Sequence, residues 1–289
     1  MVATEEILKQ VSDQYRRIRN TFRFIMGNLN DFDEKSNNVN KNDLVEIDKW
    51  IISEAIKLHE EVQKLNDNYA YHHVIQKIHN FCVHELGGVY LDIIKDRMYV
   101  TKSNSYARRS AQFALFEVAE ILIRLISPIL VFTAEEIWQS HELFKKQSVS
   151  IFMASQKVLS EIESSISDED WKKIFAVKDA VNQSIEKARA DSVIKGSLDS
   201  KISISCDKKT FKALQKIEDE LKFVFISSEV EIAESSSSRL DIEVTNFDQK
   251  KCIRCWNKCS SVGLYVEDPE ICSRCNTNVY GDGEIRKFV

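Results

Sequence analysis

The sequence has 289 residues, of which 43% are hydrophobic and 29% charged, and its formal net charge is −5 at pH 7. This length favours two or three domains, and the net charge means that any contact with a polyanion depends on local basic patches. With only 7 glycines and 2 prolines, long uninterrupted helices are expected. The most apolar run, ILIRLISPILVF, contains Arg124 and Pro128, so no membrane span is expected.

The first 141 residues carry apolar side chains at helical spacing. Between residues 4 and 29 these recur every three or four positions, which predicts one helix with a single buried stripe: Leu8, Val11, Tyr15, Ile18, Phe22, Ile25 and Leu29. Further helices are predicted over about 43–69, 71–99, 105–126 and 134–139. Gly87-Gly88 suggests a kink or a tight crossing in the third of the helices. Long helices with short connections predict an antiparallel helix bundle over residues 1–141.

The pattern changes after residue 141. Residues 141–168 are mixed and loop-like, and a helix is predicted from Trp171 to near Lys195. Four β-rich runs follow: KISISC (201–206), KFVFI (222–226), EVEIA (229–233) and RLDIEV (239–244). A helix, KTFKALQKIEDEL, separates the first two runs, and Ser235 to Ser238 is expected to form a hairpin loop. The fold class is therefore mainly α, with a small α+β module over 142–247 and a separate unit over 248–289.

That last unit contains the pattern C-x2-C-x16-C-x2-C, formed by Cys252, Cys255, Cys272 and Cys275. Four thiolates at this spacing suit one tetrahedral Zn²⁺, and four protein ligands make the metal structural. The alternatives are two disulfides or unrelated buried cysteines. Disulfides need an oxidising compartment, whereas the chain opens with the polar stretch MVATEEILKQ and is expected to be cytoplasmic.

Three further cysteines lie outside this pattern. Cys259 follows Cys255 by four residues and is expected to be a spare thiol, although it could replace one ligand. Cys82 and Cys206 are expected to be ordinary buried cysteines.

Basic residues gather on the first predicted helix. Arg16, Arg19 and Arg23 fall within about 60° of one another and flank the apolar stripe. Such an arc can neutralise successive phosphates of a folded RNA. The alternative is a solvated helix face whose arginines pair with acids of a neighbouring helix. A second basic group could lie beside the first if the helices are antiparallel: Lys95, Arg97, Lys102, Arg108 and Arg109.

Trp256, between Arg254 and Lys258, could stack on an exposed base or could cover the metal site. Signs of catalysis are scarce, because the sequence contains no Gly-rich phosphate loop, no H-E-x-x-H and no G-x-S-x-G. His72-His73 is expected to be a turn or a helix start and not a metal or acid–base site. No catalytic residue is predicted.

Six segments, in order, resemble the C-terminal part of bacterial isoleucyl-tRNA synthetases, which are class I aminoacyl-tRNA synthetases. They are SDQYRRIRNTFRFIMGNLNDF, YLDIIKDRMY, ARRSAQFALFEVAE, SPILVFTAEEIW, KARADSVIKGSLDSKI and CIRCWNKC…EICSRCNTNV…GDGEIRKFV. The resemblance covers essentially the whole chain. It implies a helical anticodon-binding domain, a small α/β junction and a zinc unit that helps to hold the anticodon end of tRNA. Cys259 and Gly87-Gly88 depart from the family pattern.

The resemblance implies the tRNA(Ile) anticodon stem-loop as partner, with the catalytic part of the synthetase as a possible second partner and a monomer as the expected state. The four zinc ligands match the family motif position by position. By charge and placement, we expect Arg16, Arg17, Arg19 and Arg23 to contact phosphates, with Arg97, Arg108 and Arg109 as second choices, and Trp256 to stack on a base. The family's HIGH and KMSKS motifs do not occur in this sequence. The chain is therefore expected to be a fragment or a split-gene product, without ligase activity on its own.

Two rival functions remain open. A stand-alone RNA-binding or scaffolding protein derived from a synthetase would have the same sequence features. The terminal four-cysteine unit also resembles the zinc finger of formamidopyrimidine-DNA glycosylases, which use an N-terminal proline as the attacking amine. Residue 2 is Val2 here, and the N-terminal half is expected to be helical where that family is β-rich.

Overall fold

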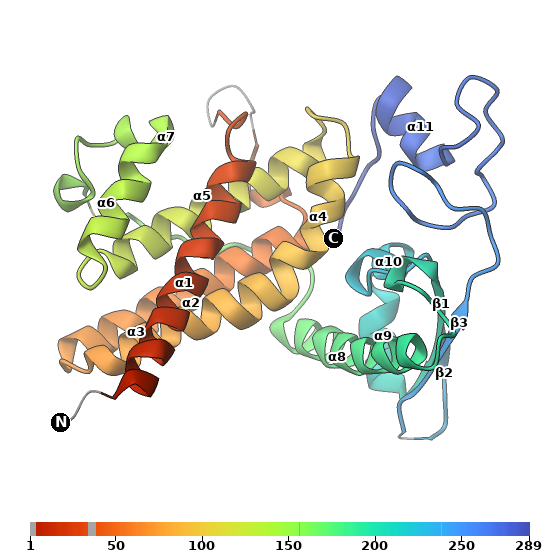
Figure 1. The fold of residues 1–289 in the computed structure, drawn as a ribbon, viewed down its shortest axis with the longest axis horizontal. Helices are drawn as coiled ribbons and strands as arrows, with labels where there is room; N and C mark the ends of the chain where they lie inside the picture. Colours follow the sequence, from red (N-terminus) through yellow and green to blue (C-terminus); the bar gives the residue numbers. More distant parts are fainter. Residues whose placement is uncertain (1–3, 34–38, 156, 238) are drawn as a thin grey trace. The chain divides into compact units, whose positions relative to one another are not determined.

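The computed structural model describes residues 4–33, 39–155, 157–237 and 239–289 (Figure 1). The chain forms two compact units. The first comprises residues 1–92 and 109–163, and the second comprises residues 93–108 and 164–289. Among the described residues, every helix is too short or too polar to cross a lipid bilayer. The division into domains at residues 141 and 247 stays a prediction.

The first unit is helical, as the sequence predicts. Its helices are α1 (Glu5–Asn28), α2 (Glu46–Asp67), α3 (Tyr71–Phe81), the π-helix η2 (Cys82–Tyr90), most of α5 (Tyr106–Ile126), α6 (Val131–Ser140) and α7 (Glu142–Lys145), with 3₁₀ turns η1 (Lys41–Asp43) and η3 (Ile151–Met153). The helix α4 (Leu91–Val100) begins in this unit and continues into the second. The described part of the segment 141–167, expected to be loop-like, thus holds one short helix and one 3₁₀ turn.

A buried carboxylate ties three helices of the first unit together. Asp48 of α2 is fully buried and accepts hydrogen bonds from the hydroxyl groups of Tyr90 (2.7 Å) and Ser110 (2.5 Å). The Ser110 hydroxyl in turn accepts from the backbone N–H of Val45 (2.9 Å). A buried carboxylate is costly unless it is hydrogen-bonded, so these contacts fix α2, η2 and α5 in one arrangement.

The apolar stripe of α1 is buried only in its C-terminal half. Ile18, Phe22, Ile25 and Leu29 are buried, whereas Leu8 and Val11 are about three-fifths exposed and Tyr15 is 37% exposed. The prediction of one continuous buried stripe was therefore wrong for its first three residues. Helical periodicity determines which residues share a face, but it does not determine how far a neighbouring helix covers that face.

The Gly87-Gly88 pair, where the sequence suggested a kink or a tight crossing, lies in the π-helix η2. The backbone N–H of Leu91 bonds to the carbonyl of Leu86, five residues earlier, as a π-helix requires. A Cβ atom on Gly87 would lie 3.0 Å from the carbonyl oxygen of Cys82, and one on Gly88 would lie 3.2 Å from that of Val83. Glycine avoids this crowding, which explains why two glycines occur within a helix.

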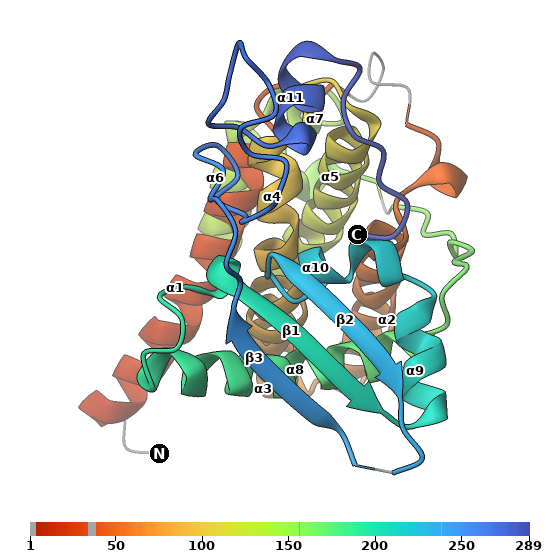
Figure 2. The same cartoon turned by 90° about the vertical axis from the view of Figure 1, so that its right-hand side faces the viewer.

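The second unit contains a three-stranded sheet, shown face-on in Figure 2. Its elements are α8 (Asp168–Ala190), η4 (Ser197–Asp199), β1 (Ser200–Cys206), α9 (Lys208–Gln215), η5 (Glu218–Glu220), α10 (Leu221–Val224), β2 (Glu229–Glu234), β3 (Asp241–Asn246) and α11 (Ser273–Tyr280). The strand order is β2-β1-β3, with β1 parallel to β2 and antiparallel to β3. Alternate residues of β1 are buried, and α8 and α9 cover that face of the sheet (Figure 2).

Two predictions in this unit were wrong. The run KFVFI forms the end of α10 and the turn after it, because Leu221, Val224 and Phe225 are the buried residues and their spacing of three and one is helical, not alternating. The serine-rich segment is not a hairpin loop, since β2 and β3 pair with opposite edges of β1 and not with each other. Ser238 lies outside the described residues. The connection from β1 through α9 to β2 is a βαβ unit, which places β2 parallel to β1.

Candidate metal centre and nucleic-acid interface

The four predicted ligands lie together in the second unit. The sulfur atoms of Cys252, Cys255, Cys272 and Cys275 all lie within 4.8 Å of one another, and all four residues are buried. The Sγ–Sγ distances are 3.7 Å for Cys252–Cys275 and 3.7 Å for Cys255–Cys272. A tetrahedral zinc with Zn–S bonds of about 2.3 Å requires sulfur separations of about 3.8 Å. The four thiols therefore fit one tetrahedral ion and are too far apart to be disulfides.

Local hydrogen bonds hold each cysteine pair in its turn. The first pair is closed by the backbone bonds from Cys252 N–H to Asn257 O and from Trp256 N–H to Cys252 O, both 2.9 Å long. The second pair begins α11, where the Cys272 sulfur accepts from the N–H of Cys275 (3.5 Å). The Cys252 sulfur also accepts from the N–H of Cys272 (3.4 Å), so the two turns face each other. N–H donors directed at sulfur favour thiolates over thiols.

The thiols also shift the pKa values of one another. Hydrogen bonds from Cys272 and Cys275 lower the pKa of Cys255, and this thiolate raises the pKa of Cys272 and raises that of Cys275 to about 12. Four thiolates in so small a volume repel one another, and only a cation among them makes full ionisation favourable. The four cysteines could therefore hold a metal ion.

The remaining cysteines do not join this centre. Cys259 packs against the cluster, but its sulfur lies 3.3 Å from the Ser261 hydroxyl and is not among the four that converge. This position agrees with the expectation of a spare thiol. Cys82 and Cys206 are buried, as expected, and burial raises the pKa of Cys82 to about 12. His72 and His73 are exposed, with ring centres 3.9 Å apart, and join no group of potential metal ligands within the described ranges.

The side chain of Trp256, the residue after Cys255, is exposed to solvent. Its side chain is 62% exposed, which favours the stacking interpretation over a covering role. Its φ angle is +65°, in the left-handed region where glycine is normally preferred. A large aromatic residue in this conformation costs free energy, of the order of 1 kcal/mol or more, and such outliers often occur at binding sites. The exposed indole thus belongs to a residue with a strained backbone, directly after the metal-ligand candidate Cys255.

The arginines of α1 differ in their partners. Arg17 and Arg23 are exposed, and no ion pair to either is found among the described residues. Arg16 is exposed and bonds to Asp13, one helical turn earlier. Arg19 points towards α6 and donates to both carboxylate oxygens of Glu136, at 2.6 and 2.7 Å. The alternative that a neighbouring acid pairs with the arc therefore applies to Arg19.

The second basic group is tied into the protein. Arg97 is only 1% exposed and donates to the carbonyl of Ala107 (3.3 Å). Arg108 donates to the carbonyls of Met98 (3.3 Å) and Ser103 (2.9 Å), so it closes the turn between α4 and α5. In the first unit, Arg109 donates to the carbonyl (2.8 Å) and the carboxylate (3.2 Å) of Asp31 and to Gln112 (2.7 Å).

Because Arg97 is buried, its guanidinium group is not accessible to an RNA phosphate.

Within the second unit, the segment that contains the four cysteines (residues 248–289, the metal-binding segment) is anchored to the end of α4. The guanidinium group of Arg254 donates to the carbonyl of Val100 (2.5 Å), and the ammonium group of Lys102 donates to that of Gly281 (2.9 Å). Arg274 forms a two-point ion pair with Asp96, at 2.6 and 2.9 Å. The sequence did not indicate these contacts, since their partners are more than 150 residues apart.

Comparison with known proteins identifies the domain type. Residues 48–204 match the family model described as the anticodon-binding domain of tRNA ligase. The chain belongs to this family. The whole chain is similar to isoleucine–tRNA ligases: it is 40% identical to that of Idiomarina loihiensis, 41% to that of Pseudoalteromonas translucida and 41% to that of Alcanivorax borkumensis, over 100% of this chain and 32% of each relative. The chain thus spans about a third of the length of these relatives, and it matches their C-terminal third.

The match to the anticodon-binding domain confirms the resemblance that the sequence motifs indicated, and it does not favour the glycosylase or scaffold alternatives. The domain match begins at residue 48 and ends at residue 204, so it covers neither the arginines of α1 nor the four cysteines. Those parts are covered by the full-length similarity to the ligases.

Two exposed aromatic residues, Tyr99 (63%) at the end of α4 and Tyr106 (44%) at the start of α5, were not predicted from the sequence. Their place in a helical pattern gave no sign that they face solvent.

Proposed function

We propose that this chain is the tRNA(Ile)-binding C-terminal region of an isoleucine–tRNA ligase and that it recognises the anticodon stem-loop. The observation that carries this proposal is the match of residues 48–204 to the anticodon-binding domain, within a chain similar along its whole length to isoleucine–tRNA ligases. Anticodon loops present unstacked bases and closely spaced phosphates. Proteins bind such RNA with arginines on the phosphates and aromatic rings on the bases.

In the first unit, the phosphate contacts are assigned to the exposed arginines of α1, namely Arg16, Arg17 and Arg23. Arg16 and Arg23 are seven residues apart, which is two helical turns, so they lie on one face with a rise of about 10 Å between them. Arg19 is a less favoured candidate for a phosphate contact, because the Glu136 carboxylate already neutralises its charge. Arg109 is the second choice for a phosphate contact in the first unit, and Arg108 is the second choice for such a contact in the second unit.

In the second unit, Trp256 is assigned to stack on an unpaired base. The support for this role is its exposure and its left-handed backbone conformation next to the four cysteines. Stacking on an aromatic ring contributes roughly 1–3 kcal/mol per base and tolerates any base. Trp256 therefore adds affinity, whereas the choice of anticodon requires hydrogen bonds to base edges.

The metal ion proposed for the centre is Zn²⁺. Its soft thiolate ligands and the tetrahedral sulfur separations suit zinc. With four sulfur ligands the ion is structural, and it supplies folding energy to a segment with few large apolar residues. Cys252, Cys255, Cys272 and Cys275 would hold it.

In this proposal the reaction served is the ATP-dependent ligation of isoleucine to tRNA, and the chemistry belongs to a catalytic region with HIGH and KMSKS motifs. We propose that such a region is the second partner of this chain, that the chain is monomeric and that it acts in the cytoplasm. The relatives that it matches are named for the whole ligase, of which this chain corresponds to a third.

The proposal is tested by titrating the chain with tRNA(Ile) and with the same tRNA carrying a foreign anticodon loop. Tighter binding of the first is expected, since the two differ only in the loop. Trp256→Ala should weaken binding of tRNA(Ile) with little change in its salt dependence, because stacking releases no counterions. Equal affinities for both tRNAs would contradict the proposed function and would favour a general RNA-binding protein.

A further inference from the structure

A largely buried cluster of four charged residues lies beside the four cysteines in the second unit. Asp96 of α4 accepts from Arg274 at 2.6 and 2.9 Å and from Arg286 at 2.7 Å. Glu284 accepts from the same two arginines at 3.5 and 3.2 Å. Burial alone would raise the pKa of Asp96, but Arg274 and Arg286 hold it below its usual value. The carboxylate is therefore ionised, and two cations and two anions balance.

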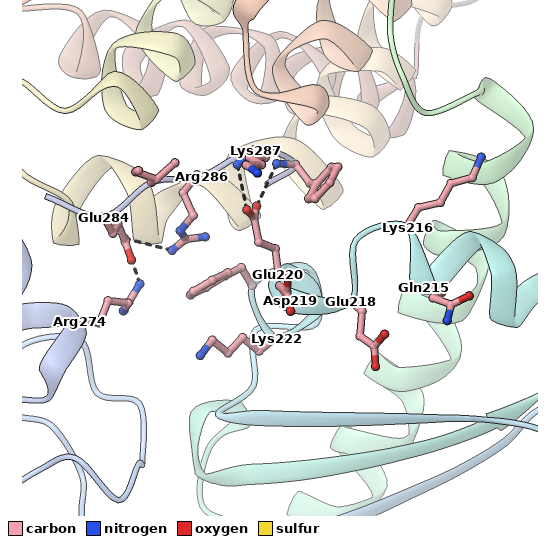
Figure 3. A pocket seen from close by; sticks show the side chains of 13 residues that line it. Gln215, Lys216, Glu218, Asp219, Glu220, Lys222, Arg274, Glu284, Arg286 and Lys287 are labelled. Atoms are coloured by element: carbon pink, nitrogen blue, oxygen red, sulfur yellow. Dashed lines mark hydrogen bonds and ion pairs between the residues drawn. The ribbon is translucent and has the colours of Figure 1, made fainter.

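This cluster joins three segments that are far apart in the sequence. Asp96 belongs to α4, and both arginines belong to the C-terminal segment that includes α11. The guanidinium group of Arg286 also lies 3.2 Å above the ring centre of Phe223, in α10. Next to it, the carboxylate of Glu220 accepts from the backbone N–H groups of residues 287, 288 and 289 at 2.7–3.0 Å (Figure 3).

The pocket beside the cluster, of about 750 Å³, does not require a ligand to explain its charges (Figure 3). It is lined by five cationic and four acidic side chains, and Asp96 adds the fifth acid. Arg274 and Arg286 already have carboxylate partners, and Lys216 pairs with Asp170 (2.6 Å). Because positive and negative side chains are nearly equal in number, the pocket does not favour an anion or a cation. The cluster instead links α4 to the C-terminal segment by ion pairs.

The charged cluster is connected to Trp256, the proposed RNA-stacking residue, through the two cysteine turns. Arg274 directly precedes the ligand Cys275, and Arg254 lies between the ligands Cys252 and Cys255. Arg254 reaches the carbonyl of Val100, whose neighbour Tyr99 is exposed. Trp256 follows Cys255 directly. The position of the indole relative to the end of α4 thus depends on the contacts that dock the metal-binding segment there.

We propose that Asp96 is a positioning residue: through Arg274 and Arg286 it fixes the metal-binding segment on the end of α4, and it thereby sets the place of Trp256 for RNA binding. This inference rests on the proposed tRNA-binding function. Asp96 itself is only a fifth exposed and bonds to two arginines, so it does not contact RNA.

The experiment uses the full chain, loaded with zinc, and four variants: Asp96→Asn, Trp256→Ala, the double variant, and Glu218→Gln. Glu218 lines the same pocket but is exposed, so its variant changes the net charge equally and leaves the cluster intact. Amide hydrogen exchange is measured over residues 96–105 and 250–278 without RNA. Affinity for tRNA(Ile) is measured for each variant, with zinc content determined by metal analysis.

In Asp96→Asn, exchange over residues 96–105 should become faster while one zinc per chain is retained, because Asp96 takes no part in the hydrogen bonds that hold the two cysteine turns. Trp256→Ala should weaken tRNA binding by roughly 5- to 150-fold in the wild-type chain. In the Asp96→Asn background, Trp256→Ala should weaken tRNA binding by less than about 2-fold, because the indole is already displaced. Glu218→Gln should match the wild type in exchange and affinity.

Unchanged exchange over residues 96–105 in Asp96→Asn would overturn the proposal, and so would an equal effect of Trp256→Ala in both backgrounds. If exchange changes but Trp256→Ala has no effect in either background, Asp96 does dock the metal-binding segment on α4, but the proposed role of Trp256 in RNA binding is wrong. Should Asp96→Asn not fold, Glu284→Gln weakens the same cluster at its longer contacts, and the same comparisons decide the outcome.

Discussion

Arg19 of α1 and Glu136 of α6, 117 residues apart in the sequence, form an ion pair with two N–O contacts of 2.6 and 2.7 Å. The hydrogen bonds to Glu136 raise the pKa of Arg19 and lower that of Glu136. The pair directs one arginine of the basic arc towards a neighbouring helix, while Arg17 and Arg23 remain exposed. The arc therefore has fewer cations available for RNA than its sequence suggests.

This difference predicts unequal effects of single arginine substitutions on the salt dependence of tRNA binding. Arg23→Gln should lower the slope of log K against log salt by about 0.7–0.9, the value for one lost phosphate contact. Arg19→Gln should change the slope by much less, and Glu136→Gln, which frees Arg19, should raise it. Titrations at three or more salt concentrations measure these slopes. Equal losses for Arg19→Gln and Arg23→Gln would show that the ion pair opens on binding.

Removal of the metal should affect the two units differently. A chelator should unfold residues 250–289, because metal binding supplies their folding energy, and should leave the helices of the first unit intact. Hydrogen exchange followed by peptide mapping distinguishes the two regions. In metal analysis, Cys272→Ser should lose the ion, whereas the matched control Cys259→Ser should keep close to one per chain. A mapped disulfide between Cys252 and Cys275 in freshly reduced protein would contradict a metal centre.

Two glycines should respond to alanine in opposite directions. Gly87→Ala places a Cβ atom 3.0 Å from the carbonyl of Cys82 within the π-helix, so it should destabilise the protein, by about 1 kcal/mol. Gly27→Ala, in α1, meets no atom within 4 Å and should stabilise it by about 0.5 kcal/mol, since alanine is the better helix former. Denaturant unfolding of both variants measures this. A Gly87→Ala protein as stable as the wild type would mean that the π-helix relaxes at little cost.

Glu220 should be important for holding the C-terminal residues in place. Its carboxylate accepts three backbone N–H groups, and Glu220→Gln replaces one acceptor oxygen by a donor. We expect a destabilisation of about 1–3 kcal/mol, because a buried N–H group is left without a partner. Faster amide exchange at residues 287–289 would confirm it. Asp219→Asn, an exposed neighbour, provides the control, and an equal change there would indicate a general charge effect.

The sequence by itself determined the features that depend on local spacing. Helical periodicity placed α1, α2, α5, α6 and α8, because a buried helix face repeats every three or four residues regardless of its partner. For a similar reason, the cysteine spacing indicated the cluster of four thiols that could hold a metal ion. Each C-x2-C turn brings two sulfur atoms together through bonds within a few residues, so the ligand set can be identified without knowledge of the fold.

The tertiary structure alone decided which of these surfaces are covered and which charges are paired. Leu8 and Val11 are exposed, and Arg97 is buried, although their sequence patterns indicate the opposite. KFVFI is apolar enough for a strand, but its buried positions in the packed unit are helical. Asp96 with Arg274, and Arg19 with Glu136, are partners across more than 100 residues. Such pairs leave no local signal, because their energy depends on a distance that only the folded chain sets.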